Sequence, residues 1–392
     1  MTDTPLLALR YPNRRMAARL QEVWNEGSAA LPVNPALPEA EVRLLLERLR
    51  PHSVEDETGV TELRQPVGVN PGTALVMATS GSSGEPKGVI LSHQALENSA
   101  RAYASRLRTG PGERWLCCLP LSHIGGLGIL VRSRLAGTEP VVLDSFDVDA
   151  VANDRQATLV SLVPTTLRRL LDSGADLARY SAVLIGGAGL SSQEAQRSRD
   201  AGVRLVQTYG MTETSGGCNF DGYPLDGVEF RVEGEQILVR GPILMDGYRL
   251  RPDLTSEALR DGWLHTADRG RMDAEGRLEV LGRLDDVIVT GGEKVSAAEV
   301  EDLLQSHPAV ADAAVGPLPD PEWGQAVAAM IVPAAGATPP VDDLKAFVAD
   351  HIARFKAPKR VFLVSSIPRT VSGKVRRPAV KAQLERLAAN GP

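Results

Sequence analysis

The chain has 392 residues, of which 43% are hydrophobic and 23% charged, the proportions of an ordinary globular enzyme. This length exceeds what one compact core usually serves, so we expect a large domain and a smaller one. The formal net charge of -6 argues against general nucleic-acid binding, and no apolar run approaches the ~18 residues that a membrane-spanning helix needs.

The first residues and the cysteines do not indicate secretion. The N-terminus lacks the hydrophobic core of a signal peptide. The three cysteines, Cys117, Cys118 and Cys218, have the spacing of neither a disulfide framework nor a metal site. We therefore expect buried, reduced thiols in a cytoplasmic protein.

The chain before the first motif is expected to carry no chemistry. Residues 16–51 have the pattern of two helices around a short strand, and residues 51–71 that of a polar, turn-rich connection. The apolar run at residues 73–78 then predicts a strand, and the amphipathic stretch at residues 93–108 predicts a helix. The segment between them is the first candidate for function.

This segment, A-T-S-G-S-S-G-E-P-K-G at residues 78–88, is rich in small and hydroxyl-bearing residues whose backbone N–H groups can close around an anion. Four hydroxyl groups can add hydrogen bonds, those of Thr79, Ser80, Ser82 and Ser83. It is not a Walker A loop, because Pro86 stands where that motif has its second glycine. A flexible linker is the alternative, but linkers do not usually end in Pro-Lys-Gly, so we interpret the segment as a nucleotide phosphate loop.

The sequence of this loop resembles the phosphate loop of the adenylate-forming superfamily, which comprises acyl-CoA synthetases, luciferases and peptide-synthetase adenylation domains. The superfamily signature Thr-Ser-Gly-Ser/Thr-Ser/Thr-Gly-x-Pro-Lys-Gly matches residues 79–88 throughout. The resemblance implies that ATP is held by Thr79, Ser80, Gly81, Ser82, Ser83, Gly84 and Lys87.

A second Gly-rich segment follows a predicted buried strand at residues 115–121, which ends in P-L-S-H-I-G-G-L-G. Parallel sheets present ligands at the C-terminal ends of their strands. A lone histidine is more often structural, but the resemblance implies that His123 lines the acyl pocket beside the reacting carboxylate. Arg132 lies nine residues on in an apolar helical stretch, where it either forms a surface salt bridge or binds a second carboxylate of the substrate.

A strand, helix and strand follow in regular succession. Residues 158–172 have the pattern of a strand and a helix, and S-A-V-L-I predicts a second strand running into G-G-A-G-L-S at residues 186–191. This order is typical of a parallel, doubly wound sheet. The glycine turn has two open interpretations: tight packing of the strand against the helix or, as the resemblance implies, a backbone against which adenine lies. In the second, Gly187 and Ala188 contact the nucleotide and Gly187 also the acyl group.

A further strand at residues 203–207 leads into T-Y-G-M-T-E-T, which matches another superfamily motif. By resemblance, Thr212 contacts the α-phosphate, Glu213 binds Mg²⁺, and Tyr209 stacks on adenine next to Gly210. A carboxylate suits a hard cation that keeps most of its waters. A capped helix start with Thr and Glu is the alternative; it explains the residue types but not the whole motif.

Residues 228–248 alternate like a set of β-hairpins and predict a small β-barrel appended to the large domain. The following G-W-L-H-T-A-D resembles the motif whose aspartate binds both ribose hydroxyls, here Asp268. A carboxylate is a natural bidentate acceptor for a diol. The superfamily usually has Thr-Gly-Asp, so Ala267 is a departure.

The segment G-R-L-D-D-V-I-V-T-G-G resembles the junction between two domains, which implies a boundary between residues 1–284 and 285–392. By resemblance Arg283 contacts the nucleotide and Asp285 is the hinge. Gly291 and Gly292 would approach the pantetheine arm of coenzyme A, since glycine lets the backbone come close. A β-turn between two strands is a compatible interpretation.

The pattern from residue 296 onward predicts a small α+β domain with helices at 297–305 and 341–352 and strands at 310–315, 326–332 and 360–364. It ends in I-P-R-T-V-S-G-K-V-R-R. By resemblance to Pro-x-Thr-x-x-Gly-Lys, Lys374 is the catalytic lysine that bridges carboxylate and α-phosphate. A basic surface loop is the alternative.

Together the motifs imply an α/β enzyme that uses Mg²⁺ and ATP to convert a small carboxylic acid into an acyl-adenylate and then, with coenzyme A, into a thioester. The passages around His123 and Thr212 look most like o-succinylbenzoate-CoA ligases of menaquinone biosynthesis. Those ligases often read P-L-F-H-I-S-G-L, with serine where this chain has Gly125.

Three alternatives stay open. The chain could be another aryl- or acyl-CoA ligase of secondary metabolism, or an enzyme that adenylates an acid for the pantetheine of a carrier protein. A non-catalytic nucleotide-binding relative would have lost Glu213, Asp268 or Lys374, and this chain keeps all three. No nucleic-acid partner is expected, and monomer and homodimer are both open.

Overall fold

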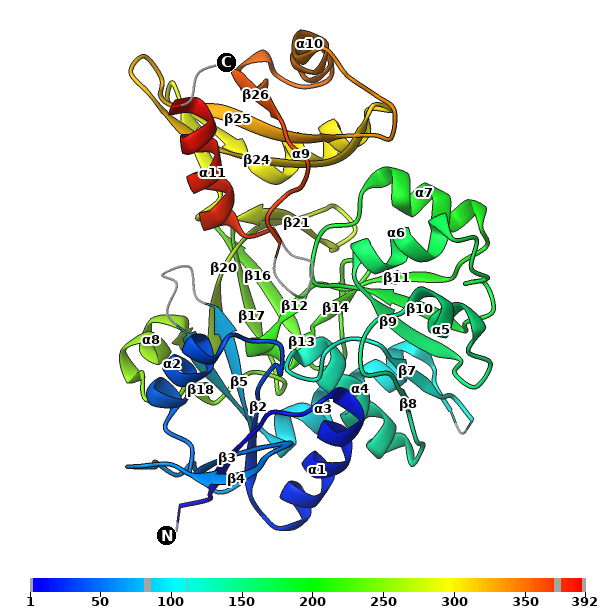
Figure 1. Cartoon of the computed structure of the whole chain (residues 1–392), viewed down its shortest axis with the longest axis vertical. Helices are drawn as coiled ribbons and strands as arrows, with labels where there is room; N and C mark the ends of the chain where they lie inside the picture. Colours follow the sequence, from blue (N-terminus) through cyan, green and yellow to red (C-terminus); the bar gives the residue numbers. More distant parts are fainter. Residues whose placement is uncertain (1–2, 81–85, 111, 370–374, 390–392) are drawn as a thin grey trace.

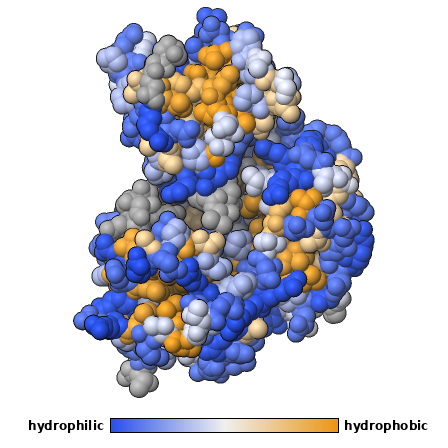
Figure 2. Space-filling view, in the orientation of Figure 1, coloured by the Kyte–Doolittle hydropathy of each residue, from blue (hydrophilic) through white to orange (hydrophobic). Residues whose placement is uncertain are grey.

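The computed structural model describes residues 3–80, 86–110, 112–369 and 375–389. The chain forms a large body and a smaller domain at one end of it, in which the first strand begins at Val287 (Figure 1). The surface is hollowed where the smaller domain meets the large body (Figure 2). Within the described part of the chain, no helix has the length and apolar character needed to cross a membrane.

The first sheet is mixed and has seven strands in the order β18-β6-β5-β2-β1-β3-β4. The strands are β1 (Leu6–Leu9), β2 (Ala29–Pro32), β3 (Ser53–Asp56), β4 (Gly59–Glu62), β5 (Thr73–Ser80), β6 (Pro86–Ser92) and β18 (Gly247–Tyr248). Its helices are α1 (Asn13–Asn25), α2 (Glu39–Leu49), α3 (His93–Leu107) and α8 (Pro252–Ala258). The helix and strand pattern predicted before residue 51 is confirmed.

One prediction for this sheet needs correction, and one of its strands was not predicted. The turn-rich connection expected at residues 51–71 contains the hairpin β3–β4. All four residues of β4 are exposed, so this strand shows none of the apolar alternation that would reveal it. The phosphate loop leads first into β6, which pairs antiparallel with β5, and only then into α3.

The second sheet is wholly parallel, in the order β11-β10-β9-β7-β8. Its strands are β7 (Trp115–Cys117), β8 (Val141–Val142), β9 (Leu159–Leu162), β10 (Ala182–Ile185) and β11 (Leu205–Gln207). The helices between them are α4 (Ile124–Ala136), α5 (Val148–Asn153), α6 (Pro164–Asp172) and α7 (Ser192–Asp200). Every residue of β9 and β10 is buried, as expected of strands covered on both faces, and the predicted parallel α/β sheet is confirmed.

A third sheet, antiparallel, stands where the small barrel was predicted. It contains β16 (Glu229–Glu233), β17 (Gln236–Arg240), β19 (Leu259–Arg260), β20 (Trp263–Met272) and β21 (Leu278–Arg283). The pairing order β16-β17-β20-β19, with β21 also on β20, shows no closure among the described strands. Shorter pieces precede it: β12 (Gly210–Met211), η1 (Thr212–Thr214), β13 (Gly216–Gly217), β14 (Asn219–Phe220) and β15 (Tyr223–Pro224).

The smaller domain is one sheet with helices on both faces. It contains β22 (Val287–Thr290), β23 (Glu293–Ser296), α9 (Ala297–Gln305), β24 (Val310–Asp320), β25 (Gly324–Pro333), α10 (Val341–His351), η2 (Arg354–Lys356), β26 (Arg360–Leu363) and α11 (Arg377–Ala389). One hydrophobic cluster joins α9 and α10 to the sheet, and a second joins α11 to its other face. The elements predicted up to β26 are confirmed, while helix α11 was not predicted.

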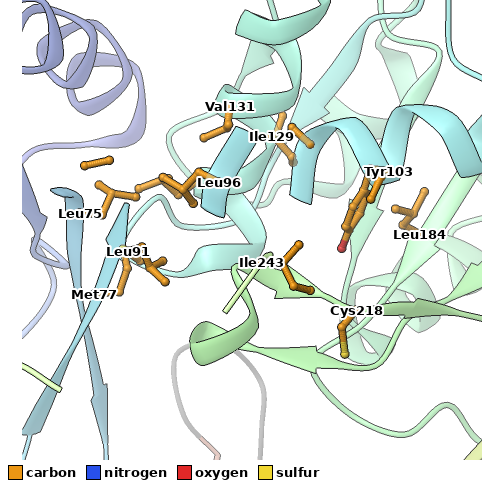
Figure 3. Packing of buried hydrophobic residues seen from close by; sticks show 14 of the residues in the cluster. Leu75, Met77, Leu91, Leu96, Tyr103, Ile129, Val131, Leu184, Cys218 and Ile243 are labelled. Atoms are coloured by element: carbon orange, nitrogen blue, oxygen red, sulfur yellow. The ribbon is translucent and has the colours of Figure 1, made fainter. Parts of the chain in front are cut away.

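The main hydrophobic cluster of the large body links the first two sheets through α3 and α4. Figure 3 shows Leu75 and Leu91 of the first sheet beside Leu96 of α3, with Ile129 of α4 beyond them. This cluster ends in sequence at Leu278, whereas the clusters of the smaller domain begin at Ile288. The three cysteines lie buried in the large body, and burial raises the pKa of each thiol to about 12, so they stay protonated.

Candidate active site

The phosphate loop is anchored by the pairing of the two strands that flank it. Thr79 pairs with Lys87 in the β5–β6 register. Gly88 follows in a place without room for a side chain, because a Cβ atom there would lie 2.7 Å from Leu49 and 2.8 Å from Val76. Four predicted site residues of this loop lie outside the described residues: Gly81, Ser82, Ser83 and Gly84.

Strand β18 connects β6 with the turn η1. The N–H of Arg249 donates to the carbonyl of Gly88 (2.7 Å), and that of Met245 donates to the carbonyl of Glu213 (2.9 Å). Tyr248 points between them, with its hydroxyl donating to Oε1 of Glu213 (2.8 Å) and Nζ of Lys87 lying 5.5 Å from its ring centroid. The structure therefore brings the loop lysine and the motif carboxylate to one tyrosine.

The turn η1 leaves Thr212 and Glu213 outside its own capping hydrogen bonds. Thr214 caps this turn instead, because its hydroxyl accepts from the N–H of Met211 (3.0 Å) and donates to backbone carbonyls. A threonine of the motif thus caps the turn, but it is Thr214, and the side chains of Thr212 and Glu213 take no part in the cap. Both side chains are half-buried at the end of the second sheet.

Tyr209 and Asp268 form a second phenol–carboxylate pair. The Tyr209 hydroxyl donates to Oδ2 of Asp268 (2.8 Å), while Nη1 of Arg283 lies 3.4 Å from the other oxygen. Burial, followed by the charge of Asp268, raises the pKa of Tyr209, so the phenol stays protonated and donates. Arg283 also pairs with Asp285 (3.0 Å), which links the predicted ribose carboxylate to the predicted hinge.

The glycine turn after β10 lies against the Tyr209 segment. A Cβ atom on Gly186 would lie 2.6 Å from the Thr208 hydroxyl, so tight packing explains this glycine. Gly187 and Ala188 are exposed, which leaves their backbone accessible. Packing also explains Gly210, where a Cβ atom would lie 2.0 Å from the carbonyl oxygen of Gly216.

Arg132 lies between two aromatic rings. Its Cζ atom is 4.4 Å from the Tyr103 ring centroid and 4.5 Å from that of Trp115. Within the described part of the chain, no carboxylate forms a salt bridge with Arg132, and its buried Nε lacks a hydrogen-bond partner. Among these described residues the alternative of a surface salt bridge is therefore not realised, because the guanidinium lies between the two rings.

This arginine and His123 belong to the same helix, α4. His123 is its half-buried N-cap residue. The Tyr103 hydroxyl, beside Arg132, accepts from the N–H of Gly217 (2.8 Å), five residues beyond Thr212. The residues around Arg132 therefore border the same motif that carries Glu213.

Gly291 and Gly292 form the turn between β22 and β23, with φ angles of 59° and 85°. The N–H of Gly291 donates to the carbonyl of Trp323 (2.9 Å), and a Cβ atom on Gly291 would lie 2.6 Å from the Trp323 ring. The β-turn interpretation is therefore confirmed, and Gly291 is needed for packing. A Cβ atom on Gly292 would meet nothing within 4 Å.

Lys374 lies outside the described residues, but both flanks of its segment are fixed. Arg369 forms a β-bridge with Val375 and an ion pair with Asp312 (2.7 Å). On the other side, Arg377 pairs with Asp286 (2.9 Å), which follows the predicted hinge residue.

Sequence reasoning missed the aromatic residues of the site, Tyr103, Trp115, Tyr248 and Trp323. Only 4% of the chain is aromatic, so an aromatic residue beside a motif was a usable signal. Trp115 is such a residue, because it begins the strand that leads to the motif of His123.

The carboxylate of Glu213 suits a metal ion that enters the site bound to the phosphates of a nucleotide. No group of three or more His, Cys, Asp or Glu side chains that could hold a metal occurs in the described ranges. Mg²⁺ is commonly bound by one or two carboxylates plus substrate phosphates, and it keeps several waters. Glu213, next to the phosphate loop, fits that role.

Comparisons with known proteins agree with this arrangement. A family model described as AMP-binding enzyme matches residues 33–249, and one described as AMP-binding enzyme C-terminal domain matches residues 299–374. A "Probable 2-succinylbenzoate--CoA ligase" of Mycobacterium tuberculosis is 44% identical over 326 residues, covering 78% of this chain and 83% of that protein. A 2-succinylbenzoate--CoA ligase of Bacillus anthracis is 33% identical over 340 residues, covering 80% and 70%.

Two solved structures of one enzyme share the fold. The o-succinylbenzoate CoA synthetase (MenE) from Bacillus subtilis, in complex with the acyl-adenylate intermediate OSB-AMP, matches with a TM-score of 0.88 and 29% identity over 97% of this chain and 89% of that one. The same enzyme with ATP and magnesium ion matches with a TM-score of 0.87 and 28% identity over 98% and 90%. Since the first family model covers more than half of the chain, this protein belongs to the AMP-binding enzyme family, the adenylate-forming enzymes that its motifs resemble.

Proposed function

We propose that this protein is an AMP-forming ligase that converts o-succinylbenzoate into o-succinylbenzoyl-CoA. The relatives at 44% and 33% identity carry that activity in their names. The observation that carries the proposal for this chain is Arg132, whose guanidinium lies between the Tyr103 and Trp115 rings with a buried, unpartnered Nε. A guanidinium can bind a carboxylate through two parallel hydrogen bonds, so Arg132 suits an acid that has a second carboxylate.

In the first step the substrate carboxylate attacks the α-phosphorus of ATP, and the bond to pyrophosphate breaks. We assign the phosphates to the phosphate loop and Thr212, the metal to Glu213, the ribose to Asp268 and the bridging charge to Lys374. Mg²⁺ held by Glu213 and the phosphates of ATP would neutralise part of the phosphate charge. Catalysis is then mostly positioning and charge stabilisation.

In the second step the thiol of coenzyme A attacks the acyl carbonyl, and AMP leaves as the thioester forms. We place the domain boundary at residues 284 and 285, between the clusters that end at Leu278 and begin at Ile288. Rotation about Asp285 would break its ion pair with Arg283, which connects it to Asp268 in this structure. The turn at Gly291 and Gly292 would then approach the pantetheine arm.

A panel of carboxylic acids in a pyrophosphate-release assay tests the proposal. Release should be fastest with o-succinylbenzoate, slower with benzoate and other monocarboxylates, and turnover should rise when coenzyme A is added. Equal rates of pyrophosphate release with benzoate and with o-succinylbenzoate would contradict the proposal that o-succinylbenzoate is the substrate. Turnover stimulated by a pantetheinylated carrier protein, and not by coenzyme A, would favour the carrier-loading alternative.

Arg132→Ala should weaken the use of a dicarboxylate specifically. The loss of a charged hydrogen bond is expected to raise the KM for o-succinylbenzoate by an amount equivalent to about 1.5–3 kcal/mol, while the KM for ATP stays unchanged. Steady-state kinetics with both substrates measure this.

The control is Arg134→Ala, which removes an exposed arginine from the same helix and should change neither KM. An Arg132→Ala enzyme that uses o-succinylbenzoate and benzoate with the parental preference would show that Arg132 does not contact the second carboxylate.

A further inference from the structure

Tyr248 stands between the two segments of the site that approach the ATP phosphates. Its backbone is fixed on both sides, because β18 pairs with β6 through Tyr248 and Val89, and the adjacent Arg249 donates to Gly88. The N–H of Met245 meanwhile holds the backbone of Glu213. The position of the Tyr248 ring is therefore set by the phosphate-loop strand and by η1 together.

The hydroxyl and the aromatic ring of Tyr248 have different partners. The hydroxyl donates to Oε1 of Glu213 at 2.8 Å, and Nζ of Lys87 lies 5.5 Å from the ring centroid. Among the hydrogen bonds of the described residues, none reaches Oε2 of Glu213. One carboxylate oxygen is thus occupied by the phenol, and the other is available to a ligand.

The phenol of Tyr248 donates to the carboxylate, since the carboxylate oxygen of Glu213 is the acceptor of this hydrogen bond. A protonated phenol has one hydrogen to donate, and Glu213 receives it. Packing alone would be satisfied by phenylalanine, so the hydroxyl calls for an explanation of its own.

The charges on either side of the ring supply that explanation. Lys87 and Glu213 carry opposite charges and both approach the place expected for the phosphates. A direct ion pair between them would neutralise the carboxylate needed by the metal and the ammonium needed by the phosphates. Tyr248 keeps the ammonium over its ring and the carboxylate at its hydroxyl, so the two remain apart.

We propose that Tyr248 is a positioning residue that orients the Glu213 carboxylate, so that Oε2 faces the hydrated Mg²⁺ of bound ATP. This inference rests on the proposed function, in which Glu213 serves the metal. The T-Y-G-M-T-E-T motif does not indicate this role of Tyr248, because Tyr248 and Glu213 are 35 positions apart in the sequence.

The test is binding of Mn²⁺, as a paramagnetic substitute for Mg²⁺, to the protein saturated with α,β-methylene-ATP. Electron paramagnetic resonance measures free Mn²⁺ and needs no acid substrate. Tyr248→Phe keeps the ring and deletes only the donor, so Mn²⁺ affinity should fall roughly tenfold or more, the scale of a hydrogen bond to a charged group. The Mg²⁺ concentration for half-maximal pyrophosphate release should rise in parallel, while the rate at saturating Mg²⁺ changes little.

Tyr209→Phe is the matched control, because it deletes the other phenol–carboxylate hydrogen bond, to Asp268. It should weaken binding of the nucleotide analogue and leave Mn²⁺ affinity of the saturated complex unchanged. Equal loss of Mn²⁺ affinity in both variants would mean general damage to the site and would overturn the proposal.

A double-mutant cycle with Glu213→Gln decides whether Tyr248 acts through this carboxylate. Adding Tyr248→Phe to the Gln protein should weaken Mn²⁺ binding no further, and an equal further loss would overturn the proposal. If Glu213→Gln alone leaves Mn²⁺ binding intact, the metal role of Glu213 and this inference fail together. If the parent binds Mn²⁺ but releases no pyrophosphate with o-succinylbenzoate, only the proposed substrate fails.

Discussion

Replacing Lys374 by alanine is expected to slow formation of the acyl-adenylate by roughly 10²- to 10³-fold, the scale seen when one transition-state donor is removed. A lysine ammonium is a point charge on a long stem, suited to bridging a carboxylate and a phosphate that would otherwise repel. Thioester formation from prepared acyl-adenylate and coenzyme A should be nearly unchanged, because in the proposed mechanism the smaller domain rotates and withdraws the lysine before that step. Rapid-quench measurement of the two half-reactions tests this.

The flanks of the lysine segment make the comparison interpretable. Arg369 on one side pairs with Asp312 and Arg377 on the other pairs with Asp286, and the Lys374→Ala substitution removes neither ion pair. Lys381→Ala, an exposed lysine of α11, is the control and should leave both half-reactions at the parental rate. Equal loss in both half-reactions of Lys374→Ala would instead assign the lysine to folding or domain docking.

The parts of the site that the sequence predicted are those encoded by short, local motifs. A phosphate loop needs small residues and hydroxyl groups in succession, so its sequence can be recognised without any knowledge of the fold. The turn that carries Thr212 and Glu213 is equally local. The parallel sheet followed from continuous apolar runs separated by helices, and the structure confirms it.

The rest depends on residues far apart in sequence. Tyr209 meets Asp268 across 59 positions, and Arg132 meets Tyr103 only because α3 packs against α4. Strand β6 escaped prediction because it lies between a strong loop signal and a strong helix signal. The spacing of hydrophobic residues along the chain does not predict such contacts, because they depend on which helices and strands lie next to one another in the folded protein.

Arg377→Ala should strongly destabilise the smaller domain. The guanidinium makes a bidentate contact with Glu301, an ion pair with Asp286 at 2.9 Å and a hydrogen bond to the carbonyl of Val315. Removing one member of a buried ionic network costs about 3–5 kcal/mol because it leaves a charge without compensation. We expect the lower end of this range, since 28% of the arginine side chain is exposed. Urea unfolding at pH 8 measures the loss, and Arg376→Ala, an exposed neighbour, should stay within about 0.5 kcal/mol of the parent.

The loss should also shrink as the pH falls. Burial raises the pKa of both Asp286 and Glu301, and in the variant the opposing effect of Arg377 is gone. The folded variant then binds more protons than its unfolded chain, so the stability of the variant relative to the parent falls as pH rises through the raised pKa values. Unfolding at pH 5 should therefore show a smaller difference between variant and parent than unfolding at pH 8. A difference that is the same at both pH values would mean that Arg377 stabilises the domain by packing its side chain between α11 and the sheet, and that the two buried carboxylates do not depend on its charge.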